Sequence, residues 1–176
     1  MPVLQECIRT GWQATVPMVT RPADLRVPFK SRYGRGVQTI FYAGNSAPVS
    51  VKGELLFDNA ALDGKSRTYL YLRHSRENSA TLNRIEKNFT AVSATIPSRT
   101  PELFRAVAGI DAPEKLLVDV SAVRQLHKRT ITLTFKGTGF TSAVEVRKLR
   151  GFKNAEITLD GKKVRENQKL AFKDGS

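Results

Sequence analysis

Two histidines are the residues of this chain whose chemistry comes closest to catalysis. His74 follows Arg73, and His127 stands directly before Lys128 and Arg129, so both lie among cations that can approach phosphate. Two histidines and a lysine can in principle carry out the acid and base steps of ribonuclease-type cleavage. Nothing in the spacing brings the two histidines together, however. We therefore expect the histidines to have structural roles or to make simple contacts. A small ribonuclease is the least favoured of three hypotheses for the function.

Other catalytic, metal and cofactor patterns are missing from the sequence. The single cysteine, Cys7, excludes an internal disulfide, and two histidines are too few for a cluster spaced like a zinc site. Gly137-Thr138-Gly139 lacks the further glycine, or the Gly-Lys-Ser/Thr ending, of a loop that cradles phosphate. We therefore expect a protein that is not an enzyme, with no catalytic residue, metal or cofactor and no small-molecule substrate.

Residues 67–73 combine aromatic and cationic side chains in a pattern that can bind bases. A strand there would send two leucines to one face and four other side chains to the opposite face. Those four are Arg67, Tyr69, Tyr71 and Arg73. Aromatic rings can stack on unpaired bases, while arginine contacts phosphate. The alternative is that tyrosine suits exposed strand positions and the arginines keep a sheet edge soluble.

A second candidate lies in residues 17–36, which three prolines and two glycines predict to be an extended arm. Residues 30–36 interleave cations, a tyrosine and glycines, so that the backbone can approach phosphate closely while arginine and tyrosine bind. We expect the arm to have little to bury in its own core and to pack on something else. Its candidate binding residues are Arg21, Arg26, Lys30, Arg32, Tyr33 and Arg35.

The third candidate is the C-terminal third of the chain. The Asp160-Gly161 turn predicts a hairpin whose return strand is 162–165, and cations crowd both here and around Gly151. A basic hairpin can reach into an RNA groove, where the release of counterions supplies most of the affinity. The alternative is a solvated face. The candidate residues are Lys128, Arg129, Arg147, Lys148, Arg150, Lys153, Lys162, Lys163 and Arg165.

The distribution of charge supports the last two candidates. The chain of 176 residues has a formal net charge of +13, and two windows carry all of it. Residues 21–36 hold five lysines and arginines against one aspartate, and residues 124–173 hold thirteen against four acidic residues. An excess confined to two stretches indicates a polyanionic partner, of which nucleic acid is the commonest.

Hydrophobic periodicity predicts the elements that carry these residues. Strands are expected at 37–42, 49–57, 67–73, 130–136, 144–146, 155–159 and 162–165. A helix is expected where Leu82, Ile85, Phe89 and Val92 recur at helical spacing, and a shorter one between Thr100-Pro101 and Gly109. Residues 113–126 fit either a helix or a buried strand.

Strands, then helices, then strands again predict an α+β fold. We expect a mainly antiparallel sheet packed by one or two helices, with an extended basic N-terminal arm and a basic C-terminal hairpin. Residues 1–36 would be the N-terminal tail and arm, and 37–176 a single domain whose basic strand region is 124–173. No segment approaches the roughly 20 apolar residues of a membrane span.

Residues 128–140 resemble the strand and Gly-x-Gly-aromatic turn in one family of large-subunit ribosomal proteins. The resemblance covers thirteen residues of 176, and the residues that follow do not continue that family's pattern. Membership of that family is therefore not predicted.

The leading hypothesis is a structural, RNA-binding protein of a ribonucleoprotein, above all a ribosomal protein that binds rRNA through two basic surfaces. Its expected partners are RNA and neighbouring proteins of a large assembly. Its expected location is an intracellular ribonucleoprotein particle, with mitochondrion, cytoplasm and viral particle left open. The alternative is a non-catalytic architectural subunit of a large protein assembly, such as a viral shell or tail or an organellar respiratory complex.

Overall fold

The computed structural model describes residues 2–23, 25, 27–63, 68–74, 79–111, 114–125, 128–136, 143–149, 154–159, 162–165 and 170–171. The helical elements are α1 (Pro2–Thr10), η1 (Gly36–Gln38) and α2 (Ala60–Asp63). The first strands are β1 (Trp12–Gln13), β2 (Met18–Arg21), β3 (Phe29–Tyr33), β4 (Ile40–Gly44), β5 (Val51–Asp58), β6 (Thr68–Arg73) and β7 (Ser79–Ile85). The remaining strands are β8 (Phe89–Ile96), β9 (Pro101–Asp111), β10 (Leu117–Gln125), β11 (Lys128–Lys136), β12 (Ala143–Leu149), β13 (Asn154–Leu159), β14 (Lys162–Lys163) and β15 (Leu170–Ala171).

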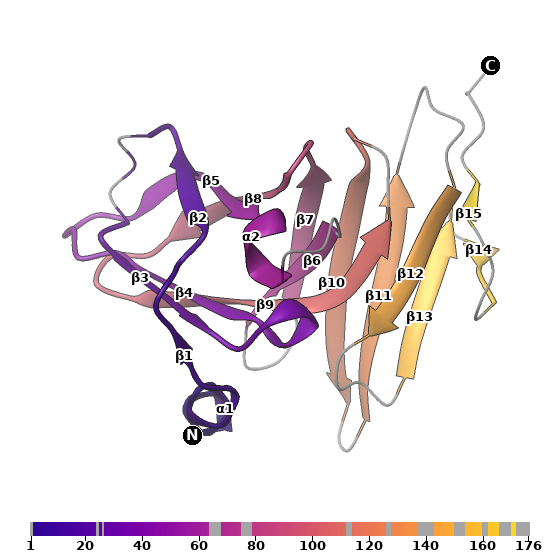
Figure 1. The fold of residues 1–176 in the computed structure, drawn as a ribbon, viewed down its shortest axis with the longest axis horizontal. Helices are drawn as coiled ribbons and strands as arrows, with labels where there is room; N and C mark the ends of the chain where they lie inside the picture. Colours follow the sequence, from indigo (N-terminus) through magenta and orange to yellow (C-terminus); the bar gives the residue numbers. More distant parts are fainter. Residues whose placement is uncertain are drawn as a thin grey trace.

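The described strands form two large sheets (Figure 1). Sheet A has the order β1-β3-β4-β9-β12-β15, and β6 pairs with the other edge of the long strand β9. Sheet B has the order β14-β13-β11-β10-β7-β8-β5-β2. Neighbouring strands are antiparallel except β11 and β13, which run parallel. The predicted α+β fold is therefore wrong, because the protein is mostly β, with two large and mostly antiparallel sheets, and its described helices are short.

The two predicted helices are strands. Residues 79–96 form the hairpin of β7 and β8, and residues 101–111 form β9. Helical spacing misleads in β7 because Leu82 is exposed, whereas the side chains that face inward are Thr81, Asn83 and Ile85. In β9 it misleads because both faces of the strand are buried from Ala106 to Ile110, which removes there the alternation typical of a half-exposed strand. Residues 113–126, which fitted either element, contain strand β10.

The predicted arm belongs to both sheets. Strand β2 pairs with β5 in sheet B, and β3 pairs with β1 and β4 in sheet A. Met18 and Val27 are buried in the core. The expectation that this segment has little to bury in its own core is therefore wrong: its isolated apolar residues, spread among cations and prolines, reach two different sheets.

Two hydrophobic cores lie on opposite faces of β6. Tyr69 and Tyr71 pack in the N-terminal core, whereas Leu70 and Leu72 pack in the C-terminal core. The N-terminal core contains Met18, Val27, Phe41, Ala43, Leu55, Phe57, Leu62, Tyr69, Tyr71, Val92, Ala94, Ile96, Phe104 and Ala106. The C-terminal core contains Leu70, Leu72, Ile85, Val107, Ala108, Ile110, Leu116, Val118, Val120, Ala122, Ile131, Leu133 and Phe135.

One face of sheet B serves both cores, and β6 meets it between them. A single row of paired residues crosses five strands of this sheet, namely Leu55, Val92, Asn83, Val118 and Phe135. The first two members lie in the N-terminal core and the last two in the C-terminal core. The polar residue Asn83 lies at the centre of the row, where the edge of β6 approaches.

Side chains of sheet B, together with Asn59 just after β5, form hydrogen bonds to the edge of β6 that does not pair with β9. Tyr71 N donates to Asn83 Oδ1 at 2.7 Å, and Asn83 Nδ2 donates to Tyr71 O at 2.9 Å. Two residues earlier, Tyr69 N donates to Asn59 Oδ1 at 3.2 Å, and Tyr69 O accepts from Thr90 Oγ1 at 2.7 Å. These bonds replace the neighbouring strand that a buried edge otherwise needs.

Candidate nucleic-acid interface

Arg21 is held by carboxylates of its own chain. It donates to both oxygens of Glu86, at 3.0 and 2.9 Å, and to Glu54 Oε2 at 3.2 Å. Arg84 bonds the same two carboxylates, so that two arginines and two glutamates form a network across β2, β5 and β7. The hydrogen bond from Arg21 holds the pKa of Glu86 below its ordinary value. A phosphate that binds Arg21 would have to compete with Glu86 and Glu54 for its guanidinium.

This network makes a prediction about acid. Because the folded pKa of Glu86 is depressed, its contribution to stability is present above the unfolded value near 4.5 and is lost as the pH falls below it. We expect Glu86→Gln to lower the Tm slightly at pH 7, and the difference from the parent to be smaller at pH 3. Thermal melts at both pH values measure this, and a gap that widens in acid would contradict it.

The other arm residues fall into two groups. Arg32 is 3% exposed and donates from Nη2 to Leu62 O at 2.9 Å, so the predicted phosphate contact by this side chain is wrong. Lys30 and Tyr33 are partly exposed, and Arg35 is exposed. Arg35 Nε donates to Gln13 Oε1 at 3.3 Å. Arg26 lies outside the described residues.

The predicted base-stacking face on β6 is also wrong. The Tyr69 and Tyr71 rings are 3% and 0% exposed, and Tyr71 stacks on Phe57 with ring centroids 4.1 Å apart. Arg73 donates from Nε to Glu102 Oε2 at 2.7 Å, and this bond raises the pKa of its guanidinium. The side chains of β6 point alternately into two hydrophobic cores, whereas the sequence pattern indicated that they alternate between one core and solvent. Arg67 lies outside the described residues.

The histidines give no acid–base pair in the described part of the chain. His74 is partly buried and its backbone N donates to Leu103 O at 2.7 Å. His127 lies outside the described residues. Among the residues that the structure describes, no group of three or more His, Cys, Asp or Glu side chains could hold a metal ion. No described helix is long and apolar enough to cross a membrane.

The C-terminal candidates lie on strands of both sheets, because β11, β13 and β14 belong to sheet B and β12 belongs to sheet A. Lys128 and Arg129 belong to β11, and Arg147 and Lys148 belong to β12. The predicted hairpin is present as β13 and β14, which pair antiparallel through Leu159 and Lys162. The exposed side chains there are Lys162, Lys163 and Arg165, and Lys163 Nζ lies 3.1 Å from Glu156 Oε2. Arg150 and Lys153 lie outside the described residues.

The positive charge of the protein is unevenly distributed along the chain. Arg21, Arg73 and Arg84 in the N-terminal half are paired with carboxylates. Residues 124–173, with thirteen lysines and arginines against four acidic residues, include strands β11 to β15. These strands occupy the right-hand end of the molecule in Figure 1. The excess positive charge is concentrated at that end.

An aromatic face on sheet A was missed by the sequence analysis, apart from Tyr33. Strand pairing places Trp12, Phe29, Tyr33 and Tyr42 on the face opposite the N-terminal core. Trp12 is 64% exposed and Phe29 57% exposed, while the two tyrosines are partly exposed. The signal available in the sequence was the period of two from Phe29 through Ser31 to Tyr33.

We compared the chain with protein-family models, with curated proteins and with solved structures, and none of them matches it.

Proposed function

We propose that the protein is a non-catalytic RNA-binding component of an intracellular ribonucleoprotein particle, a ribosome in the cytoplasm or mitochondrion being the leading case. The observation that carries the proposal is the net positive charge of residues 124–173, which hold thirteen lysines and arginines against four acidic residues. The strands of this region belong to both sheets and lie at one end of the molecule (Figure 1). A surface of this kind binds phosphates by releasing counterions.

The contribution of the arm to this function is smaller than the sequence indicated. Arg21 is bound by Glu86 and Glu54, and Arg32 is buried. Among the described candidates of the arm, Lys30 and Tyr33 are partly exposed and Arg35 is exposed, while the exposed side chain of Arg21 is ion-paired with Glu54 and Glu86. The C-terminal end is therefore proposed as the main phosphate-binding surface.

The salt dependence of binding to structured RNA tests this proposal. We compare the parent with a variant in which four cations of the C-terminal end become glutamine, namely Lys128, Arg129, Lys162 and Lys163. Each lost phosphate contact should reduce the slope of log K against log salt by about 0.7–0.9. If all four residues contact phosphate, the slope should fall by about 3, and affinity at physiological salt should drop more than tenfold.

A matched control removes the same charge elsewhere. Glutamine replaces four exposed cations of the N-terminal half and β9–β10 region, namely Lys52, Lys87, Arg99 and Lys115. The control should keep most of the slope, because net charge alone has a weaker effect than cations in contact with phosphate. A flat salt dependence in the parent, or equal losses in both variants, would contradict the proposal.

The second candidate is an architectural subunit of a large protein assembly, favoured by the exposed apolar side chains Ile8, Trp12 and Phe29. Sedimentation of the native particle before and after nuclease treatment separates the two. A particle that survives nuclease, and protein whose A260/A280 ratio after a high-salt wash is that of pure protein, would favour the assembly subunit.

A further inference from the structure

The aromatic face of Trp12, Phe29, Tyr33 and Tyr42 has an ordered arrangement on sheet A. Trp12 lies directly opposite Tyr33 in the β1–β3 register, which places their Cβ atoms about 5 Å apart. Phe29 lies opposite Gly44, next to Tyr42 on the neighbouring strand. Phe29 and Tyr33 are four residues apart on β3, about 13 Å along the strand. The face therefore has two aromatic positions, with Ser31 between them.

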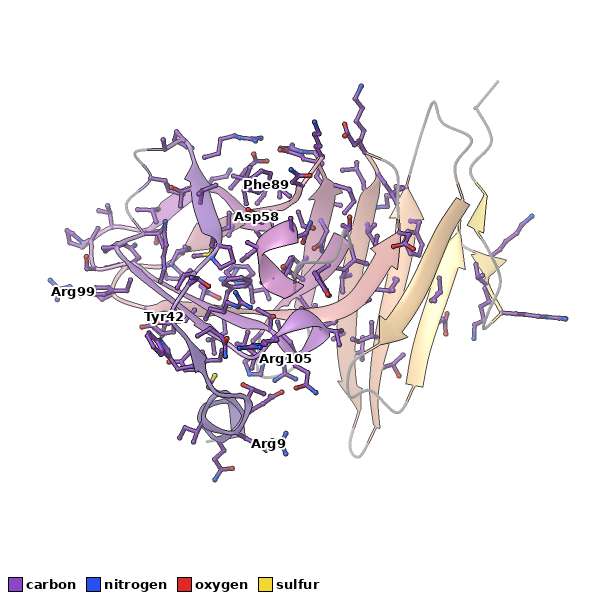
Figure 2. The ribbon with its side chains drawn as sticks, viewed as in Figure 1. Arg9, Tyr42, Asp58, Phe89, Arg99 and Arg105 are labelled. Carbon is purple, nitrogen blue, oxygen red and sulfur yellow. The ribbon has the colours of Figure 1, made fainter. Side chains whose placement is uncertain are left out.

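Glycine keeps the second position open for the Tyr42 ring. A Cβ atom placed on Gly44 would lie 2.9 Å from Tyr42 Cε1 and 3.0 Å from Phe29 Cβ, closer than real Cβ contacts. The Tyr42 ring thus lies across the Gly44 backbone, beside Phe29. Figure 2 shows Tyr42 on this sheet, with helix α1 and Arg9 below it. A ring supported in this way loses little freedom when a ligand stacks on it.

The electrostatics of this face suit an anionic ligand. In the described residues of β1, β3, β4 and the first half of β9, the acidic side chain is Glu102, which shares the opposite face with Ala43 and is held by Arg73. On the aromatic face, α1 contributes Glu6, which forms an ion pair with Arg105 of β9. Arg35, exposed and bonded to Gln13, supplies a cation at the β1 edge.

We propose that this face binds unpaired bases of single-stranded RNA, which stack on Trp12 with Tyr33 and on Phe29 with Tyr42. Exposed aromatic rings on a sheet, with an arginine at the edge and with the Glu6 carboxylate paired to Arg105, form the kind of stacking surface that such bases require. The proposal rests on the proposed RNA-binding function and adds a second surface, chemically distinct from the basic C-terminal end. The face selects unpaired strands, whereas the basic end binds phosphate in any RNA.

Tryptophan fluorescence tests the proposal directly, because Trp12 is the one tryptophan of the chain and is 64% exposed. A short oligouridylate titrated into the full chain should quench the emission of Trp12 to saturation. An RNA hairpin of equal length, whose bases are paired, should bind without comparable quenching. Phe29→Ala should weaken oligouridylate binding about tenfold, since stacking on one aromatic ring contributes that much or more.

Two controls separate the possible outcomes. Val123→Ala removes an exposed apolar side chain of β10, which belongs to sheet B and not to the sheet that carries this face, and should leave quenching unchanged. The C-terminal glutamine variant should lose hairpin affinity but keep saturable quenching by oligouridylate. If both RNAs bind without quenching, the stacking proposal is wrong while RNA binding stands. Emission that changes with protein concentration in the absence of RNA would overturn it in favour of contact between two copies.

Discussion

Replacing Asn83 with leucine is expected to destabilise the protein by about 2–5 kcal/mol, although leucine is similar in size and more apolar. Asn83 is fully buried and bonds both Tyr71 N and Tyr71 O. Without it, two backbone groups stay buried and unpaired, at a cost of about 1–3 kcal/mol each. Thermal or denaturant unfolding measures the loss, which corresponds to a fall in Tm of roughly 4–15 °C.

Two further variants show whether hydrogen bonding is the cause. Asn83→Asp keeps the shape but exchanges the Nδ2 donor for an acceptor, so it should destabilise the protein at pH 7 and recover partly in acid, where the carboxyl group can donate. Asn88→Ala changes an exposed asparagine just beyond β7 and should alter the free energy of unfolding by less than about 0.5 kcal/mol. An Asn83→Leu protein as stable as its parent would show that the edge of β6 has other partners.

Tyr71→Ala is expected to reduce stability by about 3–5 kcal/mol, which is the usual loss for truncating a buried aromatic side chain. The ring is fully buried, stacked on Phe57 and in contact with Phe41. If Tyr71 instead faced solvent as a stacking residue, truncation would weaken RNA binding and leave stability nearly unchanged. Unfolding curves, combined with RNA titrations below the Tm of each protein, separate the two cases.

Tyr33→Ala is the matched control for Tyr71. Tyr33 lies on the aromatic face of sheet A and is partly exposed. We expect a smaller loss of stability, under about 2 kcal/mol, because less of the ring leaves contact with protein. Tyr71→Ala should therefore be the less stable of the two variants, and Tyr33→Ala should be the one that binds oligouridylate more weakly. A larger loss of stability in Tyr33→Ala than in Tyr71→Ala would contradict the burial of the two rings.

Strands were predictable from sequence where one face of a strand meets solvent. In 130–136, Ile131, Leu133 and Phe135 are fully buried and alternate with threonines, as the period of two indicated. The helix predictions failed because β7 buries Thr81 and Asn83 where β6 approaches, while Leu82 faces solvent. A polar inner face of this kind depends on a strand that precedes it in the chain, so local periodicity cannot reveal it.

The candidate site, too, could be predicted only in part from the sequence. Residue types and charge identified the cations, but their partners are distant in sequence: Arg21 bonds Glu86, 65 residues away, and Arg32 bonds Leu62 O, 30 residues away. The net charge of a sequence segment does not distinguish an arginine that is paired with a carboxylate from one that can bind a ligand. The aromatic face was missed because its rings come from three strands, and pairing alone brings them together.

The two cores depend on different lengths of finished chain. Every buried member of the N-terminal core lies between Met18 and Ala106, whereas the C-terminal core also requires residues up to Phe135. During synthesis the first core can close as soon as β9 has left the ribosome, since domains fold from the N-terminus as the chain emerges. Until β10 and β11 follow, Leu70 and Leu72 present an uncovered apolar surface. A nascent chain stalled at that length would be the form of this protein most prone to chaperone binding and aggregation.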